Sequence, residues 1–191
     1  IYETHIIIFD GNYFYIYESG VYRHLDDLTV KKWVHTILKD DATTHRVNEV
    51  QGNLKVYSSV NKSNLNKLPD LNLKNGMLSI DVENHDEFIL HDHDPNILST
   101  VQLAVNYNPT ATCPKWIKTL DEIFEEDTEK INLLQEYFGL CLTADTHFEK
   151  CLFLVGEGSN GKSVILHVLM SILSEENYTA MPLEQFGNRH Y

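Results

Sequence analysis

The chain has 191 residues, of which 42% are apolar and 23% are charged. No stretch approaches the roughly 18 consecutive apolar residues that a spanning helix needs, so these values exclude membrane-spanning, collagen-like and disordered classes, and we expect no membrane partner. The formal net charge of −13 argues against a protein that coats nucleic acid through its overall field, although it leaves room for a local phosphate site.

The first third of the chain predicts a small antiparallel meander followed by two helices. Apolar and polar residues alternate over 5–9, 13–17 and 21–24, with Asp-Gly and Ser-Gly turns between these strands. From Asp26, which can cap a helix, the apolar period becomes helical, and a weaker helical pattern follows at 47–57. The apolar face of the first helix consists of Val30, Trp33, Val34, Ile37 and Leu38.

The middle of the chain predicts a second β unit and then two more helices. Strand patterns return at 71–73, 77–80 and 88–90, the first two joined by an Asn-Gly turn. Pro114 is well placed as the first residue of a helix, and Asp127 can cap the next one. We therefore expect two small β units in the N-terminal part and a helical segment after them.

The sequence motif with the clearest chemistry follows these helices. An apolar run at 151–155, predicted as a strand, leads into G-x-x-x-x-G-K-S at 156–163 and then into a helical pattern over 164–173. Glycines permit a tight path in which successive backbone amides point inward at phosphate oxygens, assisted by the positive end of the following helix. We predict that ATP binds here with Mg²⁺ as its metal. The predicted binding residues are Gly156, Glu157, Gly158, Ser159, Asn160, Gly161, Lys162, Ser163 and Val164.

Two of these residues are predicted to take part in the chemistry. Lys162 would bridge the β- and γ-phosphates, and the Ser163 hydroxyl would ligate Mg²⁺. Hydrolysis also needs an acidic Mg²⁺ partner and a group that orients water, which in this class lie on later segments, and only 28 residues follow Ser163. Since the chain also begins at Ile1, we expect a piece of a longer protein with little or no ATPase activity alone, unless acids come from upstream or another subunit.

The run 154–164 closely resembles the phage and plasmid primase-helicase family, whose AAA-like motor is a superfamily 3 helicase related to the poxvirus primase-helicase. The resemblance implies a hexameric, ATP-driven DNA helicase that replicates a mobile element in the host cytoplasm, with DNA and further copies of itself as partners. Supporting stretches are Leu73-Lys74-Asn75-Gly76-Met77-Leu78; Tyr107-Asn108-Pro109 with Ala111, Cys113-Pro114 and Trp116; and Leu134-Gln135-Glu136-Tyr137-Phe138-Gly139.

The same resemblance implies a fold class and a domain organisation. It predicts an α+β N-terminal domain of collar type at 1–110, a helical linker or collar at 111–149, and at 150–191 the first strand-loop-helix of an incomplete α/β P-loop motor. Nothing in the chain matches the family's second acidic motif, sensor asparagine, arginine finger or primase site, and Asn108 stands where the family often has aspartate. The phosphate and Mg²⁺ roles transfer to Gly156, Gly158, Asn160, Gly161, Lys162 and Ser163.

Other polar clusters have competing interpretations. The excess of basic residues in 29–69 would suit a DNA backbone, but the solvated face of a helix pair is favoured. The alternating tyrosines of 13–17 would stack bases, but a packed sheet face is favoured. His and Asp residues at 91–94 and acidic residues at 121–127 would bind metal ions, but solvated turns and helix surfaces are favoured, and Arg189 is too near the chain end to assign as an arginine finger.

Two other functions stay open on the sequence alone. One is a non-enzymatic collar or scaffold module that contacts DNA or partner subunits. The other is a different P-loop NTPase, such as a small kinase, although 155 residues before the loop are unusual for that class.

Overall fold

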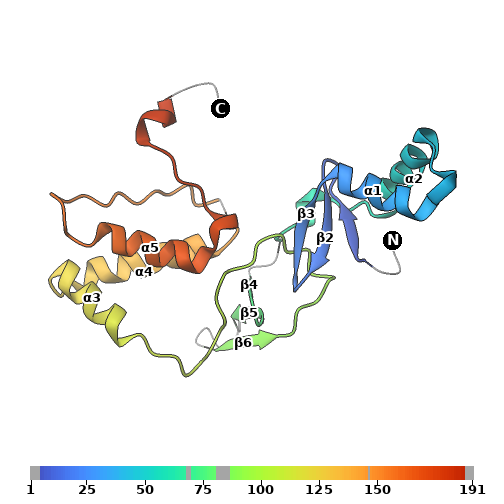
Figure 1. Ribbon diagram of the computed structural model, residues 1–191. Coiled ribbons are helices and arrows are strands. Elements are labelled where there is room, and N and C mark those ends of the chain that lie inside the picture. The colour runs from blue at the N-terminus through green and yellow to red at the C-terminus, as the bar shows by residue number, and fades with distance from the viewer. Residues whose placement is uncertain (1–4, 68–69, 81–86, 146, 188–191) are drawn as a thin grey trace. The chain divides into compact units, whose positions relative to one another are not determined.

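A computed structural model describes residues 5–67, 70–80, 87–145 and 147–187 (Figure 1). The chain divides into two compact units, Ile1–Val101 and Gln102–Tyr191. Among the described residues, the first unit contains two small antiparallel sheets and two α-helices, and the second contains three α-helices. None of the helices in the described parts of the chain is both long and apolar enough to cross a bilayer.

The first sheet is the predicted meander. Its strands β1 (Ile7–Phe9), β2 (Phe14–Glu18) and β3 (Val21–Leu25) are antiparallel in the order β1-β2-β3. Alternation places Phe14 and Ile16 on one face, where they form a buried cluster with β1, β3 and both helices of this unit. The prediction of a strand-turn-strand meander is therefore confirmed, with strand bounds shifted by one or two residues.

Both helices of this unit begin at side-chain caps. In α1 (Asp27–Leu38), the Asp26 carboxylate accepts the Thr29 amide at 2.9 Å, and in α2 (Thr44–Tyr57), the Thr43 hydroxyl accepts the Arg46 amide at 3.3 Å. The α2 helix thus begins three residues before its first apolar position, because its cap precedes the apolar face. Val30 of α1 and Leu54 of α2 pack in the same buried cluster as Phe14, so both helices cover one face of the first sheet.

The second sheet follows the predicted second β unit. Strands β4 (Leu71–Leu73), β5 (Gly76–Ile80) and β6 (Phe88–His91) are antiparallel in the order β4-β5-β6. Gly76 is required at the β4–β5 turn, since its φ is +148° and a Cβ there would overlap the His91 carbonyl oxygen. The polar residues 83–86, whose sequence predicts a turn before β6, lie outside the described residues.

The acid at the first turn, Asp10, is 7% exposed and accepts three hydrogen bonds. The amides of Asn12 and Tyr13 donate to its carboxylate at 2.8 and 2.7 Å, and the Tyr15 hydroxyl donates at 3.3 Å. Burial acts to raise the pKa of Asp10, but these hydrogen bonds outweigh it and hold the pKa below the ordinary 3.8. The ionised carboxylate of Asp10 is thus stabilised in the folded state relative to the unfolded state.

Replacing Asp10 with asparagine is expected to lower the free energy of unfolding by about 1–2 kcal/mol at pH 7. Because the folded pKa is lowered, the carboxylate's contribution is complete above about pH 4 and is lost as the pH falls through the folded value. The difference between wild type and Asp10→Asn should therefore shrink in acid, as urea unfolding at pH 7, 4 and 3 would measure. A difference that is constant with pH contradicts this account, and Asp92→Asn, at an exposed carboxylate, is the control.

The second unit is built on α3 (Pro114–Phe124), α4 (Thr128–Leu142) and α5 (Lys162–Leu173). As predicted, Pro114 is the first residue of α3, and the Asp127 carboxylate caps α4 by accepting the Lys130 amide at 3.2 Å. The three helices (Figure 1) share one core formed by Leu120, Leu134 and Ile165. The described chain also contains short 3₁₀ turns at Lys39–Asp41, Lys62–Asn64, Glu175–Asn177 and Leu183–Gly187.

The second compact unit begins at Gln102 and so includes 102–110, which the family resemblance assigns to the N-terminal domain of 1–110. Leu103 is buried, and the Ala104 amide donates to the Ile172 carbonyl of α5 at 2.8 Å. The hydrogen bond to α5 joins residues far apart in the sequence, so no local pattern reveals it.

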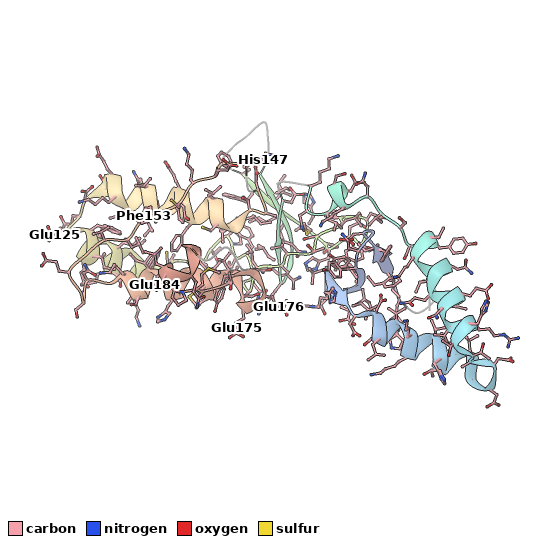
Figure 2. All side chains as sticks on the ribbon, turned by 90° about the horizontal axis from the view of Figure 1, so that it is seen from above. Glu125, His147, Phe153, Glu175, Glu176 and Glu184 are labelled. Atoms are coloured by element: carbon pink, nitrogen blue, oxygen red, sulfur yellow. The ribbon has the colours of Figure 1, made fainter. Side chains whose placement is uncertain are left out.

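The predicted strand at 151–155 is wrong as secondary structure. The side chains still alternate: Leu152 and Leu154 pack on the shared helical core, while Val155 is 90% exposed and Phe153, labelled in Figure 2, is 76% exposed. A strand requires backbone hydrogen bonds to a neighbour, and no described residue forms a ladder with this segment. The apolar run therefore lies along the helices as extended chain.

Candidate nucleotide-binding loop

The predicted phosphate loop lies between the extended segment and the N-terminus of α5. Its backbone turns through three positive-φ residues, namely Gly158 at +120°, Ser159 at +48° and Gly161 at +80°. Gly161 is the N-cap of α5, and Lys162 and Ser163 are the first two helical residues. The amides of the first helical turn have no intrahelical carbonyl partner and point out of the helix end, where they attract anions.

The Lys162 side chain folds back across this loop. Its Nζ donates to the Gly156 carbonyl oxygen at 3.0 Å and to Asn160 Oδ1 at 2.6 Å. A Cβ at position 156 would overlap Asn160 Nδ2 and lie 3.1 Å from Lys162 Nζ, so a larger residue there would displace the ends of these two side chains. The loop therefore gathers an ammonium group, a carboxamide and free helix amides within one short segment, which is a donor set that suits phosphate oxygens.

The segment before the loop is held by α4. The backbone of Leu152 hydrogen-bonds the Tyr137 hydroxyl, and the Cys141 thiol lies beside the same hydroxyl. Burial raises the pKa of Tyr137, and burial raises the pKa of Cys141, so both groups are neutral at pH 7. They position the chain before the loop and offer no reactive thiolate.

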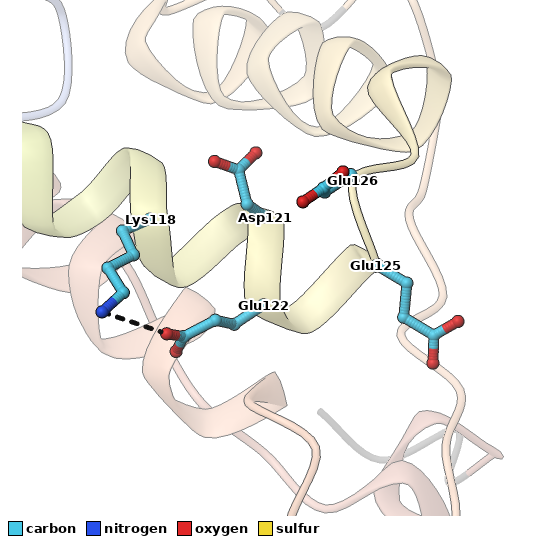
Figure 3. A pocket seen from close by; sticks show the side chains of 5 residues that line it. All are labelled: Lys118, Asp121, Glu122, Glu125 and Glu126. Carbon is cyan, nitrogen blue, oxygen red and sulfur yellow. Dashed lines mark ion pairs between the residues drawn. The ribbon is translucent and has the colours of Figure 1, made fainter.

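The acidic residues predicted as a solvated helix face form a shallow pocket at the C-terminal end of α3 (Figure 3). Lys118 Nζ lies 3.6 Å from Glu122 Oε1, while Glu125 points away from that pair. Among the described residues, no group of three or more His, Cys, Asp or Glu side chains is arranged to hold a metal ion. The interpretation of these acids as a solvated helix surface stays a prediction, as does the role of the Ser163 hydroxyl as a Mg²⁺ ligand. The pocket is lined by Lys118, Asp121, Glu122, Glu125 and Glu126.

Three other polar residues that the sequence analysis considered have partners in local structure. His93 Nε2 hydrogen-bonds the Leu73 carbonyl at 2.8 Å. Asn108 Oδ1 accepts the Thr110 amide at 3.0 Å and so closes a turn. Among the basic residues of the first unit, Arg46 pairs with Asp41 at 2.6 Å.

The predicted tyrosine face of β2 is mostly packed. Tyr15 hydrogen-bonds Asp10, and the ring of Tyr17 packs on that of Tyr22 at 5.1 Å between centroids. Tyr13 is 54% exposed and contacts the edge of the His24 ring. Arg189 lies outside the described residues.

One residue beside the loop is not marked as a site residue by the sequence pattern. Ile123, near the end of α3, lies directly against Gly161. Its spacing in α3 marks it as apolar core, but only the three-dimensional packing of α3 on α5 brings it to the loop.

Comparison with known proteins identifies the N-terminal part of the chain. A family model described as D5 N terminal like matches residues 2–125, which span the first unit and α3. No curated protein matches the chain. The matched domain is the N-terminal domain of D5-like primase-helicase proteins, which agrees with the resemblance seen in the sequence and points to a role in replication. Because the match covers more than half of its length, the chain belongs to the D5 N-terminal-like family.

Proposed function

We propose that this protein is an ATP-dependent DNA helicase of replication and that residues 156–164 bind the phosphates of ATP together with Mg²⁺. The observation that carries the proposal is the position of Lys162, whose ammonium lies across the loop between Gly156 and Asn160 at the start of α5. The family of residues 2–125 supplies the replication context. DNA and further copies of the chain, as a hexamer, are the proposed partners of the full-length protein.

The residues of the loop fit a triphosphate. Gly158 has open space where a Cβ would stand, so a phosphate can approach the backbone there. The first-turn amides of α5 would bind phosphate oxygens, and Lys162 would exchange its two oxygen partners in the loop for oxygens of the β- and γ-phosphates. In the full-length protein, hydrolysis of ATP would supply the free energy for unwinding, and Mg²⁺ held with the help of Ser163 would neutralise charge on the phosphates.

The alternative functions predict different behaviour. A collar or scaffold module would bind Mg·ATP no better than a variant that lacks the lysine. A small P-loop kinase would transfer phosphate to small acceptors and would not unwind DNA.

The test is a calorimetric titration of the chain with Mg·ATP, followed by competition with inorganic pyrophosphate. We expect saturable binding that pyrophosphate displaces, because the loop contacts are to phosphates. Unwinding of a forked DNA by the full-length protein, without phosphate transfer to small acceptors, separates the helicase from a kinase. Absence of Mg·ATP binding would overturn the proposal.

Replacing Ser163 with alanine is expected to weaken ATP binding about tenfold when Mg²⁺ is present, because one metal-bound hydroxyl is lost. Binding measured in EDTA should change by less than about twofold, since the loop amides and Lys162 remain. Ser171→Ala, at an exposed serine later in the same helix, is the matched control. An equal loss with and without Mg²⁺ would remove Ser163 from the metal site.

A further inference from the structure

Gly161 is held against the last turn of α3. A Cβ built on Gly161 would overlap Cδ1 of Ile123, lie 2.5 Å from its Cγ1 and lie 3.6 Å from its Cβ. Glycine is thus needed at 161 for two separate reasons, the φ of +80° and the isoleucine side chain above it. The end of Ile123 causes the overlap, whereas its Cβ stands at an ordinary contact distance.

The contact of Ile123 with Gly161 can affect phosphate binding, because Gly161 is bonded directly to Lys162. Gly161 immediately precedes Lys162, and its carbonyl accepts the Ile165 amide at 3.1 Å, which is the first hydrogen bond of α5. Ile165 is buried in the same core that Ile123 packs against. The position of Gly161 therefore sets where α5 begins and where the free amides and the lysine of its first turn lie.

The segments before and after the loop both pack on the core that α3 and α4 share. Leu152 and Leu154 pack on the shared core before the loop, and Ile165 packs there after it. Within the loop, Ile123 contacts Gly161, the N-cap residue of α5. Ile123 also lies inside the segment matched by the family model, whereas the loop lies beyond its end.

We propose that Ile123 is a positioning residue for phosphate binding: its Cγ1 and Cδ1 atoms hold Gly161 so that Lys162 and the first-turn amides of α5 meet the phosphates of ATP. This inference rests on the proposed nucleotide binding by the loop. It assigns to a helix of the family domain a direct influence on nucleotide affinity.

The test is a double-mutant cycle in the whole chain, with Mg·ATP binding measured by calorimetry well below the thermal transition of every variant. Ile123→Ala is expected to weaken binding about fivefold. Gly161→Ala is expected to weaken it about 50-fold, since the new Cβ meets Ile123 and the backbone is strained. In the double variant the Cβ at 161 meets only the β-carbon of residue 123, so only the backbone penalty of about fivefold should remain beyond Ile123→Ala.

Two further variants separate positioning from general packing. Ile123→Val keeps Cγ1 over Gly161 and should restore binding to within about twofold of wild type. Ile117→Ala, at a position of the same helix that is 54% exposed, should leave binding unchanged. If Gly161→Ala does not fold, the comparison of alanine with valine at position 123 still decides the question.

The outcomes distinguish this inference from the proposed function. If wild type does not bind Mg·ATP, the proposed function fails and this inference fails with it. If wild type binds but the effects of Gly161→Ala and Ile123→Ala multiply independently, the inference alone is overturned. It is also overturned if Ile123→Ala lowers the thermal transition while Mg·ATP affinity stays at the wild-type value.

Discussion

Replacing Lys162 with alanine is expected to weaken Mg·ATP binding by about 100-fold, because a charge-assisted contact to the β- and γ-phosphates is lost. Lys162 Nζ donates to two oxygens of the loop, at 2.6 and 3.0 Å. A triphosphate carries far more negative charge than these neutral oxygens, so the lysine gains by the exchange. Calorimetric titration of wild type and variant with Mg·ATP measures the loss.

The matched control for this prediction is Lys118→Ala. Lys118 is an exposed lysine of the same unit and pairs with Glu122 across 3.6 Å of solvated surface. Its removal should change Mg·ATP affinity by less than about twofold, because exposed ion pairs contribute little. Equal affinities for wild type and Lys162→Ala would contradict nucleotide binding by the loop and would favour the collar or scaffold function.

Replacing Phe14 with alanine is expected to lower the free energy of unfolding of the first unit by about 3–5 kcal/mol. Phe14 is 0% exposed and lies at the centre of the cluster shared by the first sheet, α1 and α2. Its removal loses the burial of the ring and leaves a cavity bounded by helices and strands that cannot easily close. Urea unfolding measures this change.

The positions of the two tryptophans allow unfolding of the first unit to be measured separately by fluorescence. Trp33 packs against the Phe14 cluster, and Trp116 lies in α3 of the second unit. In a Trp116→Phe background, fluorescence therefore reports the unfolding of the first unit. Tyr13→Ala, one residue away at an exposed ring, is the control and should cost about 1 kcal/mol or less. Similar costs for Phe14→Ala and Tyr13→Ala would show that the cluster is not the core of this unit.

Local signals predicted most of the secondary structure. The Asp26 cap, the proline at 114 and the Asn-Gly turn before β5 each act within a few residues, and the structure places a helix start or a hairpin at each one. The G-x-x-x-x-G-K-S motif predicted the helix that follows it, because a glycine-rich turn and a helical apolar period are adjacent in sequence. These features need no distant partner to form.

Features that depend on distant partners were not predictable from the sequence. An apolar run such as 151–155 reads as a strand, but a strand exists only when a neighbouring backbone pairs with it, and here the run packs on helices by alternate side chains. The attachment of 102–110 to α5 and the contact of Ile123 with Gly161 likewise join residues far apart in the chain. The sequence by itself determined the helices, the hairpins and the loop motif, since these follow from neighbouring residues. Only the tertiary structure decided which side chains surround the loop, because that depends on how the helices pack.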